Sequence, residues 1–380
     1  MITLRAARCL EFDGALATPA SNARAAWARR PGLLLQLVAS QGQAGEGEAS
    51  PLPGLSGESL ADCRAALAAL PLDALRLDER APFADWAAAT APIRAGLPAA
   101  ARCALETAAL DLLGRVLGRP AWALLAPRGP SSPASLPLGT LLLGETPERV
   151  AAEAASARAR GIRCLKLKVG RPGALERELE LARAARAAAP ELELRLDANR
   201  AFRLAEALPA LYRFAALGCE LVEEPAAELD LGAVAAGDRA AREIARRIAA
   251  APIPVALDES LRDAPFGALR AVAGDGFPAA VVLKPTILGG PARALELAAE
   301  ARDVGADVIV THTLDGPVAL AVAAAVALVV GSTRRAMGLD VHAGLDAWPS
   351  RAVPALRGAA LAPWHEPGLG LLPLAMGNDR

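Results

Sequence analysis

Short apolar runs and long alanine-rich segments alternate along the chain, and their order divides it into parts. Near the N-terminus the apolar run LLLQLVA predicts a strand, and after a glycine-rich turn GEGEAS predicts a strand that returns beside it. Apolar residues at helical spacing then predict helices over 58–70 and 98–118. This first part therefore has an α+β pattern.

From about residue 137 the pattern changes to a repeated strand and helix. The strand-like runs are LPLGTLLLG, CLKLKVG, ELRLDAN, CELVEEP, PVALDES, AAVVLKP, DVIVTHT and RAMGLDVH. Helical segments such as GALERELELARAARAAA and PARALELAAEARDVGA lie between most of them. Repeated β–α units of this length favour parallel strands with right-handed crossovers. About eight strands in roughly 215 residues suit a (β/α)₈-type barrel better than an open sheet.

Segments rich in proline and glycine mark the expected domain boundaries. The stretch APRGPSSPAS (126–135) is predicted to link an α+β domain at 1–128 to a barrel domain at 129–350. Beyond that, the regular alternation is lost, and we expect residues 351–380 to pack back on the first domain. The most apolar run, VALAVAAAVALVVG, is too short for a membrane span and predicts a buried helix.

The composition is that of a globular protein with balanced charge. Among 380 residues, 53% are hydrophobic, and 41 basic and 42 acidic side chains give a net charge of −1. No overall field therefore attracts nucleic acid or an anionic membrane. Five scattered cysteines without a CxxC pair, and an N-terminal stretch without the apolar core of a signal peptide, favour reduced thiols and a cytoplasmic location. No feature assigns an oligomeric state.

Charged residues stand at the predicted strand ends, where barrel enzymes place their catalytic groups. In chain order they are Lys166, Lys168, Asp197, Glu223, Asp258 and Lys284. From Lys168 onward they are about one β–α unit apart, so the side chains are expected to converge at one mouth. Taken alone, the DAN, EEP and DES segments also suit an Asx turn, a solvated turn and a helix N-cap. Three converging carboxylates repel one another without a cation, and oxygen ligands suit Mg²⁺.

Lys166 and Lys168 lie on one face of their strand, because side chains alternate along it. The flanking Leu165, Leu167 and Val169 need to pack outward against helices, so the lysine face is predicted to line the barrel interior. A nearby cation and a second ammonium group lower the pKa of a lysine and leave a neutral amine that acts as a base. Such a base beside Mg²⁺ suits removal of a proton from the carbon next to a carboxylate.

The motifs LKLKVG, RLDAN, LVEEP, ALDES and VVLKPTILGG resemble, in this order, strand-end motifs of the muconate lactonizing enzyme subgroup of the enolase superfamily. The resemblance implies an α/β fold: a modified TIM barrel of the (β/α)₇β type, with an N-terminal α+β capping domain that the C-terminal tail completes. It implies that Lys168 is the base, Lys166 its partner and Lys284 the opposing lysine.

The same resemblance implies a cofactor and its supporting residues. Mg²⁺, with Mn²⁺ as a possible substitute, would bind Asp197, Glu223 and Asp258. The supporting positions around these ligands would be Arg195, Asn199 and Glu259. The substrate would be a small-molecule carboxylate.

A further match is to one branch of the subgroup. GEGEASPLPGLSGESLADC (45–63) resembles the substrate-capping loop of o-succinylbenzoate synthases, and 101–114 and 337–345 resemble the next helix and the last strand of that family. This implies syn-dehydration of 2-succinyl-6-hydroxy-2,4-cyclohexadiene-1-carboxylate to 2-succinylbenzoate, a hydro-lyase step of menaquinone biosynthesis. The substrate contacts would come from Pro53, Thr311, Thr313 and Gly316.

Other readings use the same residues differently. In an N-succinylamino acid racemase or dipeptide epimerase, Lys168 and Lys284 would act as two bases. The SPLPG loop and the lack of an acidic DxD signature near the last strand argue against this alternative. A non-catalytic scaffold is disfavoured because every expected position is filled. We interpret His312 as a packed or solvent-facing histidine that points away from the site. The residues His342, His365 and Cys164 are not expected to act in catalysis either.

Overall fold

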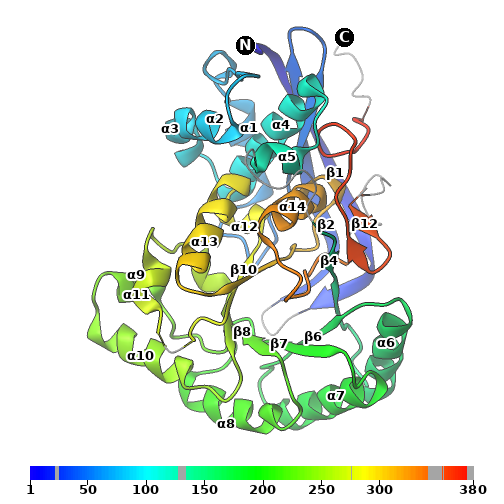
Figure 1. Ribbon diagram of the computed structural model, residues 1–380, viewed down its shortest axis with the longest axis vertical. Helices are drawn as coiled ribbons and strands as arrows, with labels where there is room; N and C mark the ends of the chain where they lie inside the picture. Colours follow the sequence, from blue (N-terminus) through cyan, green and yellow to red (C-terminus); the bar gives the residue numbers. More distant parts are fainter. Residues whose placement is uncertain (22–24, 127–133, 275, 341–352, 354, 375–380) are drawn as a thin grey trace.

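The N-terminal part is an antiparallel sheet with helices beside it (Figure 1). The computed structural model describes residues 1–21, 25–126, 134–274, 276–340, 353 and 355–374. The three strands, in spatial order, are β1 (Leu4–Ser21), β2 (Ala26–Ala39) and β3 (Ala44–Ala49). The helices are α1 (Leu60–Ala68), η1 (Leu72–Ala74), α2 (Phe83–Ala89), α3 (Ala91–Ala95), α4 (Ala99–Leu117) and α5 (Ala121–Leu125). The returning strand and the two long helices lie where the sequence predicts them.

Glycine in β3 allows α4 to lie directly against the sheet. A Cβ atom at Gly47 would overlap the carbonyl oxygen of Ala104, so only glycine fits at this crossing. The helix ends at Gly118, which adopts a left-handed φ of 64° that favours glycine. The alternating GEGE segment therefore serves two faces: its glycines lie toward α4, whereas Glu46 accepts a hydrogen bond from Leu374 and Glu48 accepts one from Gly316.

Seven parallel strands and their connecting helices form the second part. The strands, in spatial order, are β11 (Asp307–Val310), β10 (Ala280–Leu283), β9 (Val255–Leu257), β8 (Leu221–Glu223), β7 (Glu193–Asp197), β6 (Cys164–Lys168) and β5 (Gly139–Leu141). The connecting helices are α6 (Pro147–Ala159), α7 (Leu175–Ala188), α8 (Leu204–Ala215), α9 (Leu231–Ala235), α10 (Arg239–Ala249), η2 (Glu259–Leu261), α11 (Ala268–Val272), α12 (Pro285–Leu288), α13 (Pro291–Asp303) and α14 (Pro317–Val330).

A short extended segment joins the two outer strands of this sheet. Met337 forms a parallel bridge with Leu138, beside β5, and Gly338 forms one with Thr311, directly after β11. The amide of Gly139 donates to the carbonyl of Met337, and the amide of Gly338 donates to that of Val310. These bridges supply the eighth strand position, so the (β/α)₇β barrel expected from the sequence is confirmed.

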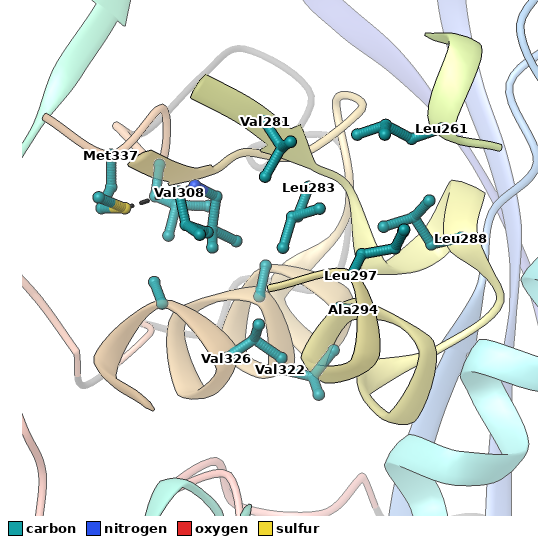
Figure 2. Packing of buried hydrophobic residues seen from close by; sticks show 14 of the residues in the cluster. Leu261, Val281, Leu283, Leu288, Ala294, Leu297, Val308, Val322, Val326 and Met337 are labelled. Carbon is teal, nitrogen blue, oxygen red and sulfur yellow. Dashed lines mark hydrogen bonds between the residues drawn. The ribbon is translucent and has the colours of Figure 1, made fainter. Parts of the chain in front are cut away.

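The outer face of the barrel packs on its helices, as Figure 2 shows for β10 and β11. Leu283 of β10 points toward α13 and α14, and Leu297 and Val322 of these helices belong to the same buried cluster. Leu165, Leu167 and Val169 belong to the same buried cluster, as their predicted outward direction requires. A separate small apolar cluster is formed by Leu221, Ala256, Ala280, Val282 and Ile309. This second cluster comes from four adjacent strands and forms the floor below their charged ends.

The chain after the barrel returns to the first domain. The short strand β12 (Leu356–Arg357) pairs with β13 (Ala360–Leu361), which in turn pairs with β4 (Leu136–Pro137). The amide of Leu369 donates to Asp111 of α4, and the amide of Ala121 in α5 donates to the carbonyl of Gly368. These two hydrogen bonds bring the described part of the tail against α4 and α5, whereas the bounds 351–380 stay a prediction.

The apolar segment at 318–331 forms most of α14 and is almost entirely buried, as predicted. Within the described ranges, no helix is both long and apolar enough to cross a membrane. The predicted domain boundaries fall in or beside 127–133 and 341–352, outside the described residues, and stay predictions.

Candidate active site

The predicted charged residues meet at the carboxyl ends of adjacent strands. Lys168 is the Cα partner of Asp197 across β6 and β7, and Asp197 is the partner of Glu223 across β7 and β8. Asp258 and Lys284 directly follow β9 and β10. The three carboxylates and Lys284 are all at most 8% exposed. Parallel strands with matched ends thus place these side chains around one buried mouth, as their spacing predicted.

Two of the lysines are paired with the predicted metal ligands. Nζ of Lys166 lies 2.8 Å from Oδ2 of Asp197 and 2.5 Å from Oε2 of Glu223. Nζ of Lys284 donates to Oδ2 of Asp258. Burial opposes the charge of both lysines, but the carboxylates outweigh it and raise the pKa of each. Lys166 and Lys284 are therefore ammonium ions in this arrangement.

Lys168 has a different environment. Burial lowers the pKa of its ammonium group to about 8, and the charges of Lys166 and Lys284 add to this effect while Asp197 opposes it. We expected a cation and a second ammonium group to lower this pKa, but burial of the Lys168 side chain is the larger cause. Among the three, Lys168 is the lysine that most readily becomes a neutral amine near neutral pH.

The acidic side chains fit a divalent cation. Burial raises the pKa of Asp258 and Glu223, whereas the lysines outweigh burial at Asp197 and lower its pKa to about 2. Five carboxyl groups face three lysines at these strand ends, a formal excess of two negative charges. The five are Asp197, Glu223, Glu224, Asp258 and Glu259.

Unpartnered oxygens support the same fit. Oε1 of Glu224 accepts from the amides of Asp258 and Ser260, but its Oε2 is buried and has no hydrogen-bond partner among the described residues. The same holds for Oε2 of Glu259. Buried carboxylate oxygens are costly without a partner, and oxygen donors with a two-charge excess suit Mg²⁺.

The predicted supporting residues divide into two groups. The backbone amide of Asn199 donates to Oδ1 of Asp197 (3.0 Å), and its side chain donates to Glu259 (2.9 Å). Asn199 therefore connects the end of β7 to the segment that follows β9. Arg195 instead donates to Glu220 and to the carbonyl of Ala336, away from the carboxylates it was expected to support. Its role beside the metal ligands stays a prediction.

The predicted substrate contacts already have partners within the protein. Thr311 Oγ1 donates to the carbonyl of Gly338, and Thr313 Oγ1 donates to Asp315. The amide of Gly316 donates to Glu48 (2.7 Å), and the carbonyl of Pro53 accepts from Trp27. Direct binding of substrate by the two hydroxyls and by the Gly316 amide stays a prediction, and it would require them to exchange or share these partners.

The histidines and Cys164 are not placed as catalytic groups. Nδ1 of His312 accepts from the amide of Leu314, and burial lowers its pKa to about 4, so this imidazole is neutral. His365 is exposed, and His342 lies outside the described residues. Cys164 is buried, and its burial raises the pKa of the thiol to about 12.

A second group of ligand-type side chains lies close together at Cys164, Glu193 and Glu220. Arg163 pairs with Glu193, and Arg195 pairs with Glu220. These arginines already neutralise the two carboxylates, and a thiol with a raised pKa is a poor ligand. We therefore interpret this group as an ion-pair cluster of the barrel wall.

A pocket borders the strand ends on the side of Lys284. It is lined by Leu55, Asp258, Glu259, Arg262, Lys284 and Ile287. Leu55 comes from the predicted capping loop, so this loop forms a wall of the pocket. Apolar and charged residues both line this pocket, which suits a carboxylate attached to an apolar body.

Several residues of the site were missed by the sequence analysis. Trp27 and the buried Arg30 reach this region from the capping domain, where local patterns do not single them out. Glu224 was also left out, although it stands in the LVEEP motif. One signal was available: the chain has 38 arginines and only three lysines, and all three lysines are at the site. Arginine cannot act as a base near neutral pH, so this distribution points to a need for amines here.

Comparison with known proteins agrees with this arrangement. Residues 149–374 match the family described as "Enolase C-terminal domain-like", and residues 7–126 match "Mandelate racemase / muconate lactonizing enzyme, N-terminal domain". An o-succinylbenzoate synthase from Desulfotalea psychrophila is 30% identical over 339 residues, which are 80% of this chain and 84% of that relative. A hydrophobic dipeptide epimerase from Citrifermentans bemidjiense is 35% identical over 208 residues, only 52% of this chain and 54% of the relative.

The fold is also that of a solved relative. The substrate-liganded L-Ala-D/L-Glu epimerase from Bacillus subtilis superposes with a TM-score of 0.82 over 98% of this chain and all of that one, at 21% identity. The two family matches together span most of both domains, and members of this group are Mg²⁺-binding enzymes that act on small molecules. The chain therefore belongs to the enolase superfamily.

Proposed function

We propose that this enzyme is an o-succinylbenzoate synthase, which dehydrates 2-succinyl-6-hydroxy-2,4-cyclohexadiene-1-carboxylate to 2-succinylbenzoate in menaquinone biosynthesis. The observation that carries the proposal is the contrast between the lysines. Lys166 and Lys284 are paired with carboxylates, whereas Lys168 has no carboxylate partner among the described residues. One unpaired amine opposite a paired ammonium suits a reaction that needs a single base.

Lys168 would remove the proton from the carbon next to the ring carboxylate. Its amine becomes an ammonium group, which then gives that proton to the hydroxyl that leaves from the same face, so the loss of water is syn. Lys284 would lie against the opposite face of the ring and stabilise the negative charge of the enediolate. Aromatisation favours the products, so the main task of the site is to stabilise that anion.

Asp197, Glu223 and Asp258 would hold Mg²⁺, with Mn²⁺ as a possible substitute. A bound divalent ion would supply Lewis-acid stabilisation of the substrate carboxylate. Asn199 would keep Asp197 and Glu259 in place through its two hydrogen bonds. To bind the ion, the carboxylates would exchange part of their contact with Lys166 and Lys284 for the metal.

Two observations favour dehydration over racemisation. The carboxylate of Asp340, at the eighth strand, receives both Nη1 (3.0 Å) and Nη2 (2.6 Å) of Arg160, so its charge is already compensated where an acidic residue would bind a substrate ammonium. The capping-loop resemblance at 45–63 points the same way.

The second candidate is an N-succinylamino acid racemase or dipeptide epimerase. It is supported by the second lysine, because Lys284 and Lys168 both stand at the mouth and two-base exchange needs a lysine on each face. The two reactions share the first proton removal, so metal dependence does not separate them.

The test is a paired assay of the full chain with Mg²⁺. One sample receives the cyclohexadiene substrate, and formation of 2-succinylbenzoate is followed by its absorbance. The others receive N-succinylamino acids or hydrophobic dipeptides in D₂O, and α-proton exchange is followed by NMR. Dehydration faster than exchange supports the proposal. Rapid exchange with no dehydration would assign the second candidate instead.

A further inference from the structure

The three lysines of the chain are held in place by different groups. Carboxylates hold the ammonium groups of Lys166 and Lys284. In the described part of the chain, Nζ of Lys168 makes neither a hydrogen bond nor an ion pair, and the contact recorded for it is the ring of Trp27, whose centroid is 5.7 Å away. A flexible lysine side chain needs some contact to define its direction, and here that contact is aromatic.

Trp27 is itself fixed in place. It lies in β2 of the capping domain, is 7% exposed, and packs with Leu16, Ala20 and Leu52. Its Nε1 donates to the carbonyl of Pro53 (2.9 Å), which orients the indole in its plane. The ring is therefore a rigid surface presented to Lys168 by a different domain.

We propose that Trp27 is a positioning residue for Lys168, which seats the amine against its ring so that it faces the substrate. The inference rests on the proposed role of Lys168 as the base. A carboxylate in the same place would hold the amine in its protonated form, whereas a ring packs against the neutral amine as well. Once the amine has taken a proton, the ring face attracts the ammonium that results, so the contact strengthens as the reaction proceeds.

The same contact connects the base to the capping loop. Pro53 accepts the indole hydrogen bond, and Leu55, two residues further on, lines the pocket beside Asp258 and Lys284. The short segment 53–55 thus orients the ring that contacts Lys168 and also forms one wall of the pocket.

The small number of lysines makes a direct test possible. Protein labelled with ¹³C at the lysine ε-carbon gives three side-chain signals, and the Lys168→Arg variant identifies one of them. We expect the Lys168 ε-protons to be shifted upfield by the indole ring in the wild-type protein. The shift should be largely kept in Trp27→Phe, which keeps a ring, and lost in Trp27→Leu.

Kinetics supply the second readout. Removing the aromatic contact in Trp27→Leu should lower kcat roughly 3- to 30-fold relative to Trp27→Phe, while any change in KM should be shared by both variants, because both lose the hydrogen bond to Pro53 and only Trp27→Leu loses the ring. Trp27→Phe should recover most of the loss. Trp86→Phe changes another buried tryptophan of the capping domain and should leave both readouts unchanged.

The outcomes separate this inference from the proposed function. An unshifted Lys168 signal in the wild-type protein would overturn the role of Trp27 even if Trp27→Leu failed to fold, and so would an unchanged kcat in a folded Trp27→Leu. Neither result would affect the function as long as Lys168→Ala is inactive. Full turnover in Lys168→Ala would instead overturn the assignment of the base, whatever the position of the signal.

Discussion

Nζ of Lys166 lies 2.8 Å from Oδ2 of Asp197, so the lysine next to the proposed base is held as an ammonium ion by a proposed metal ligand. It also contacts Glu223, and together these carboxylates raise its pKa against the effect of burial. Lys166 and Lys168 share a strand face but have opposite electrostatic environments. The division of roles between them therefore arises from the partners that neighbouring strands supply.

The pH dependence of catalysis should reflect this division. The pKa of Lys168 is lowered from 10.5 to about 8, and its neutral form is the base, so kcat/KM should rise with pH and level off above about 8. A bound cation would lower the pKa of Lys168 further, so the rise in kcat/KM would then occur at a lower pH. The measurement is kcat/KM from pH 6 to 10 at saturating Mg²⁺.

A variant provides the internal control for that profile. In Lys166→Met the repulsion from Lys166 is lost but Lys168 stays buried. The apparent pKa in the pH profile of kcat/KM should therefore rise, but only part of the way to 10.5. A wild-type limb close to 10.5 would show that Lys168 is not buried as the structure places it.

Metal removal should stop turnover. EDTA should abolish activity, and Mg²⁺ or Mn²⁺ should restore it, because the carboxylates at the strand ends carry an uncompensated excess of charge. Replacing a residue that orients the ligands should weaken the site without removing it: Asn199→Ala should lower Mg²⁺ affinity about 10- to 100-fold. Calorimetric titration with Mg²⁺ measures this directly.

The matched control for the metal titration is Glu176→Gln. Glu176 is an exposed carboxylate of α7 that pairs with Arg213, away from the strand ends. The Glu176→Gln variant should bind Mg²⁺ with the same affinity as the wild-type protein. Turnover that persists after complete chelation would contradict the metal site itself.

The capping domain should depend for its stability on a buried arginine. Arg30 is fully buried, and it donates to the carbonyls of Ser50 and Thr313 and to Asp315. Arg30→Met should lower the free energy of unfolding by about 3–5 kcal/mol, because it leaves buried acidic groups without their cation. Urea unfolding followed by circular dichroism gives the value.

The adjacent arginine serves as a control. Arg29 pairs with Asp13 on the surface, with both side chains more than half exposed. Arg29→Met should change the stability by less than about 1 kcal/mol. Equal losses in the two variants would mean that the buried hydrogen bonds of Arg30 to Ser50, Thr313 and Asp315 add no more stability than the surface pair does.

The strand ends could be predicted from the sequence because the alternation of apolar and polar residues fixes which face each side chain occupies. Lys166 and Lys168 were placed in the interior by the three apolar residues around them, and the spacing of the acidic residues placed them on adjacent strands. These are local properties of the chain, and the structure reproduces them.

Contacts between distant segments could not be predicted in this way. The amide of Gly316 was expected to face substrate, but Glu48, 268 residues earlier, accepts its hydrogen bond. Trp27 reaches Lys168 from the other domain. Partner choice of this kind depends on how two domains pack, and neither periodicity nor motif spacing carries that information.

The most direct test of the account is the rate of 2-succinylbenzoate formation by Lys168→Ala compared with wild type, at saturating Mg²⁺ and with the folded state checked by circular dichroism. If Lys168 is the base, the variant should be properly folded and still bind Mg²⁺, with kcat lower by on the order of 10³-fold or more, because the amine that takes the proton is gone. A folded Lys168→Ala protein that forms 2-succinylbenzoate at the wild-type rate would contradict it.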